Sequence, residues 1–432
     1  MNEELAAIPF YQRAIELDPN FALAYARLGP AYSNLGEDGA SEEYRRKAFE
    51  LRDRASERER LYITGQSYGV TGQVNEWTRT WELYKQTYPR DPSPYVNLSN
   101  SYNDLGQFDK ALENGLEAVR VSSGSANAYW QSAYAYMGLN RLDEAKAILN
   151  SALQRKVGRD LIHFTLSLIA IAQGDRAAQE REDAFVKGHA DGELWLVSRD
   201  ADLAASRGQL KQARELFLRA RQMAQRLDLK ENAAGTVADE AGMEANLGYR
   251  AEAAKGATAA LAISRAPYVV YSAARTLAFA GEASKAETLI AELAKRRPLD
   301  VWVQSLQAPE VKAINETNRG NPAKALELLQ AAVPYEGGAY FGVRYTRGKA
   351  YLRAGDGTEA AQQFHEVLDL RNLEVGNPIF SLAQLGLARA YALQGDKAKS
   401  RMAYQDFFAL WKDADPDIPI LKEAKAEYAK LK

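Results

Sequence analysis

A residue that breaks an α-helix recurs along this 432-residue chain at nearly constant spacing. Five successive occurrences lie 34 residues apart, and the others follow at spacings of 33 to 40 residues. They are Gly36, Gly72, Gly106, Asn140, Gly174, Gly208, Gly248, Gly281, Gly320, Gly355 and Gly395. A period of this size is typical of a solenoid built from repeated structural units. Glycine suits such a turn because it adopts the left-handed conformation that ends a helix without steric cost.

A small residue follows most of these turns by five positions, at the start of the next helical run. The small residues are Ala111, Ala145, Ala213, Ala253, Ala286, Ala325 and Ala360. Alanine at this place lets two helix backbones approach closely. We therefore expect Ala111 and Ala145 to lie where the two helices of a pair touch, and eleven turns predict about eleven helical hairpins.

Between the turns, apolar and small residues recur with the period of an α-helix. One helical face carries Tyr25, Leu28, Gly29 and Tyr32. The same offsets hold Tyr95, Leu98, Ser99 and Tyr102, and then Tyr129, Ser132, Ala133 and Tyr136. Strand patterns are nearly absent. The sequence therefore predicts an all-helical chain of about 22 helices and a C-terminal cap.

Two segments resemble the tetratricopeptide repeat (TPR): FALAYARLGPAYSNLG, residues 21–36, and FDKALENGLEAV, residues 108–119. The pattern of that family has an aromatic residue, Leu-Gly and Tyr in the first helix, and Ala, an aromatic residue, Ala and Pro in the second. The resemblance implies an all-α fold, in which about eleven TPR-like hairpins form a right-handed superhelical solenoid with a concave groove.

Three segments are predicted along the chain. Residues 1–208 hold regular TPR units, of which the first is incomplete, because residues 3–17 resemble the second helix of a unit without its first. Residues 209–413 hold divergent TPR-like units, in which the turn spacing widens to 39 or 40 residues. Residues 414–432 carry two prolines and a Lys/Glu-rich helix, and we expect them to form a C-terminal capping segment. Trp77 occupies the alanine position of its unit, where we expect smaller neighbours to accommodate the ring rather than a bend.

Composition excludes several classes of site and partner. The chain has no cysteine, so it has no disulfide, thiolate metal site or cysteine nucleophile. Lys and Arg number 55 and Asp and Glu 57, and this balance disfavours a nucleic-acid partner. No apolar run approaches the roughly 20 residues that span a bilayer. We expect a cytoplasmic chain without membrane insertion; the alternative is the extracytoplasmic array of a membrane-anchored protein.

The sequence shows no constellation that would support catalysis. Phosphate-binding, dinucleotide-binding and kinase motifs are absent, and so is the Gly-x-Ser-x-Gly elbow of hydrolases. The histidines His163, His189 and His365 are scattered. The segment HEVLD starts like a zinc-protease helix but places Asp369 where the second histidine would stand. We therefore expect no enzyme activity, no metal and no cofactor.

A candidate binding site follows from the register of the first helices. Residues 10, 6 and 3 places before a turn share a face, which the resemblance assigns to the concave groove. For three successive units these residues are Val96, Asn100 and Asn103, then Trp130, Tyr134 and Met137, then Phe164, Leu168 and Ile171. The predicted peptide or partner site comprises Asn97, Asn100, Asn103, Trp130, Gln131, Tyr134, Phe164 and Leu168. Aromatic rings supply contact area and amides can bond a peptide backbone. The alternative is that these rings pack inside the solenoid.

The resemblance also bears on function. The TPR clamp for chaperone C-termini needs lysines, but the corresponding places hold Val96, Gln131 and Thr165, so chaperone-tail capture is not expected. The overall texture is similar to TPR arrays attached C-terminally to bacterial serine/threonine kinases and to winged-helix regulators. This similarity implies a protein-interaction scaffold, the accessory array of a larger bacterial signalling protein. The alternative is a sensor of a small ligand or peptide in a transcription regulator.

Overall fold

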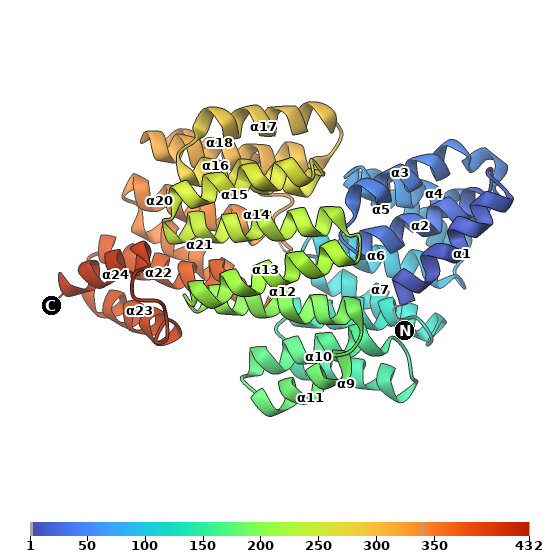
Figure 1. The fold of residues 1–432 in the computed structure, drawn as a ribbon, viewed down its shortest axis with the longest axis horizontal. Helices are drawn as coiled ribbons and strands as arrows, with labels where there is room; N and C mark the ends of the chain where they lie inside the picture. Colours follow the sequence, from blue (N-terminus) through green and yellow to red (C-terminus); the bar gives the residue numbers. More distant parts are fainter. Residues whose placement is uncertain (1–2, 339, 432) are drawn as a thin grey trace. The chain divides into compact units, whose positions relative to one another are not determined.

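The computed structural model describes residues 3–338 and 340–431. Throughout this part of the chain the regular structure is helical, with 24 α-helices and no strand (Figure 1). The prediction of an all-α, TPR-like solenoid is confirmed. The right-handed sense of the superhelix and the number of repeats stay predictions.

The chain divides into two compact units. Unit 1 runs to Leu196 and includes Leu299–Val301, and unit 2 comprises Val197–Pro298 and the residues from Trp302 onward. These two units are defined by how densely the chain packs. The predicted segments 1–208, 209–413 and 414–432 are defined by how regular the repeats are, and they stay a prediction.

Eleven helices lie wholly in unit 1, and α12 contains the boundary. They are α1 (Glu3–Leu17), α2 (Ala22–Asn34), α3 (Asp38–Glu50), α4 (Glu57–Val70), α5 (Val74–Thr87), α6 (Pro92–Asp104), α7 (Phe108–Val121), α8 (Ala126–Gly138), α9 (Leu142–Gln154), α10 (Arg159–Gln173) and α11 (Arg176–Val186), followed by α12 (Ala190–Ser206). A 3-10 turn, η1 (Arg52–Arg54), precedes α4.

Unit 2 continues with twelve α-helices. They are α13 (Leu210–Arg226), α14 (Lys230–Leu247), α15 (Arg250–Ile263), α16 (Pro267–Ala280), α17 (Ala283–Arg296), α18 (Ala308–Arg319), α19 (Pro322–Leu329), α20 (Phe341–Ala354), α21 (Gly357–Asp369), α22 (Pro378–Leu393), α23 (Lys397–Leu410) and α24 (Pro419–Ala429). A π-helical segment, η2 (Trp302–Gln307), leads into α18, and a 3-10 turn, η3 (Gln330–Ala332), follows α19.

All eleven predicted turn residues adopt the left-handed conformation. Their φ angles run from 58° at Asn140 to 99° at Gly248. In this region a side chain crowds the backbone, so glycine is favoured and asparagine is the usual substitute. The turns therefore confirm the repeat that the sequence spacing predicts.

Each turn joins two helices that pack on each other, and the first helices of successive pairs also pack together. Within unit 1, α6 packs on α7 and α8, and α8 packs on α9 and α10. Within unit 2, α16, α18 and α20 follow the same order. This arrangement places α6, α8 and α10 side by side in unit 1 and α16, α18 and α20 side by side in unit 2, and we call each row of first helices a wall.

Close contacts within the hairpins use small residues, as predicted. Ala111 and Ala145 are fully buried, and the hydroxyl of Ser99 on α6 donates to the carbonyl oxygen of Ala111 on α7 at 2.7 Å. A side chain larger than alanine would separate these backbones.

The tryptophans of α5 lie against glycines of α4. A Cβ placed on Gly65 would lie 2.6 Å from the ring of Trp81, and one on Gly69 would lie 3.1 Å from Nε1 of Trp77. Smaller neighbours therefore accommodate both rings, as expected for Trp77.

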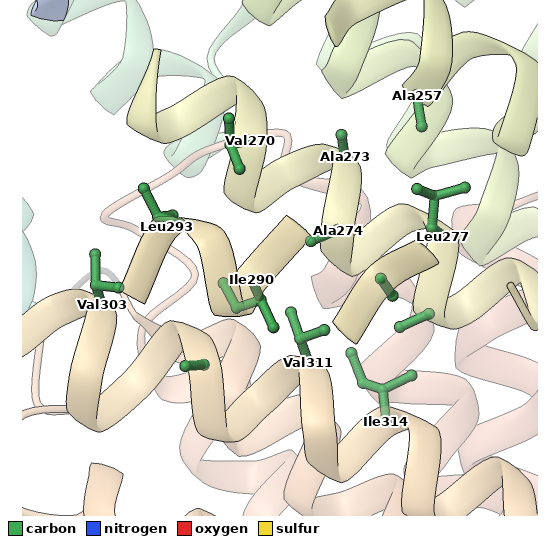
Figure 2. Close-up of a cluster of buried hydrophobic side chains, with 13 residues drawn as sticks. Ala257, Val270, Ala273, Ala274, Leu277, Ile290, Leu293, Val303, Val311 and Ile314 are labelled. Atoms are coloured by element: carbon green, nitrogen blue, oxygen red, sulfur yellow. The ribbon is translucent and has the colours of Figure 1, made fainter. Parts of the chain in front are cut away.

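The core of unit 2 contains a cluster in which three helices meet. The cluster in Figure 2 contains Val270, Ala273 and Leu277 of α16, Ile290 of α17 and Val311 of α18. All five side chains are buried. The cluster also includes Ala274 and Ala278 of α16, and these small side chains let α16 lie close to its neighbours.

The beginning and the end of unit 2 are joined by hydrogen bonds. The Trp411 indole donates to the carbonyl oxygen of Ser206 at 2.9 Å. The amide of Asp415 donates to the carbonyl oxygen of Gly208 at 2.9 Å, and its carboxylate accepts from the amide of Lys211 at 2.9 Å. Unit 2 therefore closes on itself.

The first prediction concerns the left-handed turn. Gly174 has a φ of 71°, and a Cβ there would meet no atom within 4 Å. Gly174→Ala therefore adds backbone strain without a clash, and we expect it to lower the free energy of unfolding by about 1 kcal/mol. Gly124→Ala is the control, because its Cβ also meets no atom and its φ lies outside the left-handed region. Urea denaturation monitored by circular dichroism compares them, and equal losses would contradict this account.

The second prediction concerns the contact within a hairpin. Ala111→Leu should overpack the interface of α6 and α7 and lower the free energy of unfolding by roughly 1–3 kcal/mol. Ala177→Leu makes the same change at an exposed position of α11 and should have little effect. If the two variants melt alike, Ala111 does not lie at a tight contact.

Candidate functional site

The predicted site residues lie on three adjacent first helices of unit 1. Asn97, Asn100 and Asn103 are on α6, Trp130, Gln131 and Tyr134 are on α8, and Phe164 and Leu168 are on α10. Asn103 and Gln131 are buried, and the other six side chains are partly exposed.

Hydrogen bonds between amide side chains connect these helices. Nε2 of Gln131 donates to Oδ1 of Asn100 at 3.0 Å, and Nδ2 of Asn103 donates to Oε1 of Gln131 at 2.8 Å. One helix earlier, Nε2 of Gln66 donates to Oδ1 of Asn97 at 3.0 Å. The amides therefore bond one another, and Asn103 and Gln131 contribute to the packing of the wall.

These bonds follow a repeating register. We call the residue six places before a turn residue the inner position, and the residue nine places before it the cross position. Gln66 and Asn100 occupy inner positions, and Asn97 and Gln131 occupy the cross positions of the next first helices. In both cases the inner side chain lies beside the cross side chain of the following repeat, an arrangement that sequence reasoning did not identify.

The aromatic residues form two pairs. The ring centroids of Trp130 and Tyr134 lie 5.5 Å apart at an interplanar angle of 36°, as expected for residues one helical turn apart. Phe164 pairs with Trp195 of α12, with centroids 5.6 Å apart. Neither ring pair is fully enclosed, because all four side chains are partly exposed. Apolar surface therefore remains open to a ligand on this wall.

Trp195 is a residue that the sequence analysis missed. It lies 13 places before its turn residue, Gly208, rather than at one of the three offsets that were considered. The signal available in the sequence was the tryptophan itself, on the first helix next to that of Phe164.

Asp104 is the group in this region whose ionisation differs most from the ordinary behaviour of its type. Burial raises the pKa of its carboxyl to about 7. It follows Asn103 at the end of α6, so a carboxyl that is partly protonated at neutral pH stands at the edge of the predicted site.

The histidines occupy separate packing environments. His163 stacks on Phe185 with centroids 4.1 Å apart and shares a 2.7 Å hydrogen bond between Nδ1 and Oε2 of Glu182. Nε2 of His365 bonds Oη of Tyr391 at 2.8 Å. Among residues 3–338 and 340–431, no group of three or more His, Asp or Glu side chains is placed to hold a metal ion. None of the helices described has the length and apolar character needed to cross a membrane.

Several inner positions of the wall in unit 2 hold charged side chains. The inner positions there include Arg275 of α16, Lys349 of α20 and Arg389 of α22. The same offset that selects Asn100 and Tyr134 in unit 1 selects these cations, but the sequence analysis applied it only to three units.

Two segments of the chain, residues 126–156 and 345–416, match the tetratricopeptide repeat. No curated protein matches the sequence. Among solved structures, the chain is similar to the TPR domain of P58(IPK), with 13% identity, coverage of 87% of this chain and 98% of that one, and a TM-score of 0.26. It is also similar to yeast Tom70, with 12% identity, coverage of 95% of each chain and a TM-score of 0.34.

The matched repeats bear on function at a coarse level. Tetratricopeptide repeats bind protein or peptide partners and generally act as non-catalytic scaffolds. The fold of this chain therefore supports a role in protein–protein interaction.

The third prediction separates packing from binding at the amides. Gln131→Ala removes the side-chain hydrogen bonds to Asn100 and Asn103, so the buried Nδ2 group of Asn103 keeps only its 3.1 Å bond to the backbone carbonyl oxygen of residue 131. We expect the free energy of unfolding to fall by about 2 kcal/mol. Gln154→Ala, at the exposed end of α9, is the control and should have little effect. Urea denaturation measures both, and an unchanged Gln131→Ala protein would show that these bonds do not stabilise the wall.

Proposed function

We propose that this chain, a tetratricopeptide repeat array, is an interaction scaffold that binds an extended peptide along α6, α8 and α10 of unit 1. The observation that carries the proposal is the partly exposed pair of Trp130 and Tyr134 on the wall of first helices. Aromatic side chains are the usual energetic centres of protein interfaces, because they bury a large area at low entropic cost.

The neighbouring residues suit a peptide ligand. Phe164 and Trp195 extend the apolar surface by two further helices, and Leu168 lies one helical turn from Phe164. On the other side, Oδ1 of Asn100 accepts from Gln131, which leaves its Nδ2 group available to donate to a peptide carbonyl oxygen. A ligand could thus place apolar side chains on the rings and its backbone beside α6.

We place this scaffold in the cytoplasm, as the accessory array of a larger bacterial signalling protein such as a serine/threonine kinase. The support is the similarity of sequence style to the arrays that follow such kinases. The open reading frame upstream of this chain tests the context directly, because it would encode a kinase or a winged-helix domain. Cell fractionation distinguishes the cytoplasmic scaffold from an extracytoplasmic array of a membrane-anchored protein.

One observation favours the alternative of a ligand sensor. Trp411 and Asp415 bond the segment at Ser206 and Gly208, so unit 2 is closed by its own ends. A closed unit suits a ligand that is small enough to be surrounded. Thermal-shift screening against metabolites and against short peptides separates the two functions, because a scaffold should respond only to peptides.

The fourth prediction tests the peptide site. Dodecapeptides that bind the chain are selected from a random displayed library, and their affinities are measured by fluorescence anisotropy. Trp130→Ala should weaken the selected peptides by about 2 kcal/mol, because it removes one of the two tryptophan rings of the patch. It should affect folding much less, because the ring is partly exposed.

Leu83→Ala is the matched control for this experiment. Leu83 is 53% exposed on α5, the second helix of its pair, so its truncation should leave the affinities unchanged. Equal affinities for Trp130→Ala and Leu83→Ala would contradict the proposed site. Unfolding of Trp130→Ala would show instead that the ring belongs to the core.

A further inference from the structure

Three cations occupy inner positions in unit 2. They are Arg275 of α16, Lys349 of α20 and Arg389 of α22. Two of them have carboxylate partners. Nε of Arg275 lies 3.0 Å from Oε1 of Glu310, and Nε of Arg389 lies 2.9 Å from Oε2 of Glu427.

The carboxylate of Glu310 accepts hydrogen bonds from three neighbouring side chains. It is completely buried on α18 and accepts hydrogen bonds from Arg275, from the hydroxyl of Tyr271 and from the hydroxyl of Thr346 at 2.8 Å. These bonds fix the guanidinium of Arg275 and leave Glu310 little capacity to neutralise a further cation.

Lys349 differs from the two arginines because its ammonium has no ion pair or hydrogen bond among the described residues. It contacts aromatic rings instead. Nζ lies 4.4 Å from the ring centroid of Phe279 and 5.6 Å from that of Tyr345. The ammonium is thus positioned by cation–π contacts, which supply no acceptor for its three N–H groups.

The cation–π contacts of Lys349 bring side chains of two first helices together. Phe279 belongs to α16 and Lys349 to α20, and α18 packs between these two helices. Side chains from α16 and α20 therefore meet over α18. The ammonium of Lys349 therefore has aromatic side chains of two first helices beside it.

The charge of Lys349 is disfavoured in the free protein. Burial, together with the positive charges of Arg275, Arg389 and Arg250, lowers the pKa of its ammonium to about 8. At pH 7 the group is still mainly protonated. An anion beside the ammonium of Lys349 would accept hydrogen bonds in place of the water lost on burial. It would also offset the repulsion of Lys349 by the three arginines.

The register explains why no protein group supplies this anion. The cross position that follows Lys349, nine places before Gly395, is Gly386. A Cβ on Gly386 would lie 2.6 Å from the ring of Phe364, so the packing of that ring excludes a side chain. The inner cation is therefore left without the cross-position partner that Asn100 has in unit 1.

We propose that the wall of first helices at Lys349 binds an oxyanion, the carboxylate or phosphate group of a ligand. Lys349 donates to the anion, and Arg275 and Arg389 act as fixed positive charges beside it. The site lies in unit 2 and is independent of the peptide patch in unit 1. The anion could be carried by an acidic peptide or be a free small ion.

Isothermal titration calorimetry of the 432-residue chain tests this site with two probes, inorganic phosphate and hexaglutamate, at constant ionic strength and pH 7. Lys349→Gln should weaken the bound probe about tenfold or more, as expected for loss of a hydrogen bond to a charged group. Lys349→Arg keeps the charge and should retain binding. Lys295→Gln, which removes an exposed lysine of α17, should change binding little.

The outcomes distinguish the sources of the anion. Lys349-dependent binding of phosphate supports a free ion, and Lys349-dependent binding of hexaglutamate alone supports an acidic peptide. The absence of binding to both probes, or equal losses in Lys349→Gln and Lys295→Gln, overturns the proposal. Lys349→Gln should fold at least as stably as the parent because it removes a disfavoured charge. Trp130→Ala should leave this binding unchanged, so the two proposed sites can fail separately.

Discussion

The left-handed turn residue is the constraint on which the rest of the structure depends. It lies in the short linker that reverses the chain, so the second helix of each pair returns along the first. The return brings Ala111 against α6 and requires a small side chain there. Once the pairs have a common shape, successive first helices stack in a common register. The spacing of the turns thus determines which side chains meet between repeats.

The same register carries different chemistry in the two units. In unit 1 an inner amide bonds a cross amide, as Asn100 and Gln131 show. In unit 2 the corresponding pair is Asp202 and Asp239. Burial raises the pKa of Asp202 well above its ordinary value, and repulsion from Asp239 and Glu374 raises it further. A hydrogen-bonded amide pair stabilises the stacking of two repeats. A carboxylate pair destabilises this stacking at neutral pH, because burial and mutual repulsion disfavour the charged forms.

The sequence predicts those features that depend on the chemistry of one residue. A turn needs a left-handed φ, and a close helix contact needs alanine, so Gly174 and Ala111 could be identified from their types and spacing. The roles of Asn103 and Gln131 could not, because an amide can bond a ligand or a neighbouring helix equally well, and the choice depends on the stacking of repeats. Lys349 was missed for a different reason: its offset was known, but its missing partner becomes visible only when Phe364 is seen to fill the place beside Gly386.

Binding sites on such a wall are expected where the inner and cross residues do not pair with each other. A completed inner–cross pair, such as Asn100 with Gln131, uses its hydrogen-bonding groups within the protein and has less to offer a ligand. The pairing ends at α10, where the cross residue Thr165 donates its hydroxyl to the carbonyl oxygen of Leu161 in its own helix. It also ends at Lys349, because the cross position of the following repeat is Gly386. Both proposed sites therefore lie where the helices keep the same register but an inner residue and the following cross residue do not bond each other. A solenoid can in this way vary its ligands from repeat to repeat without changing the turns that hold it together.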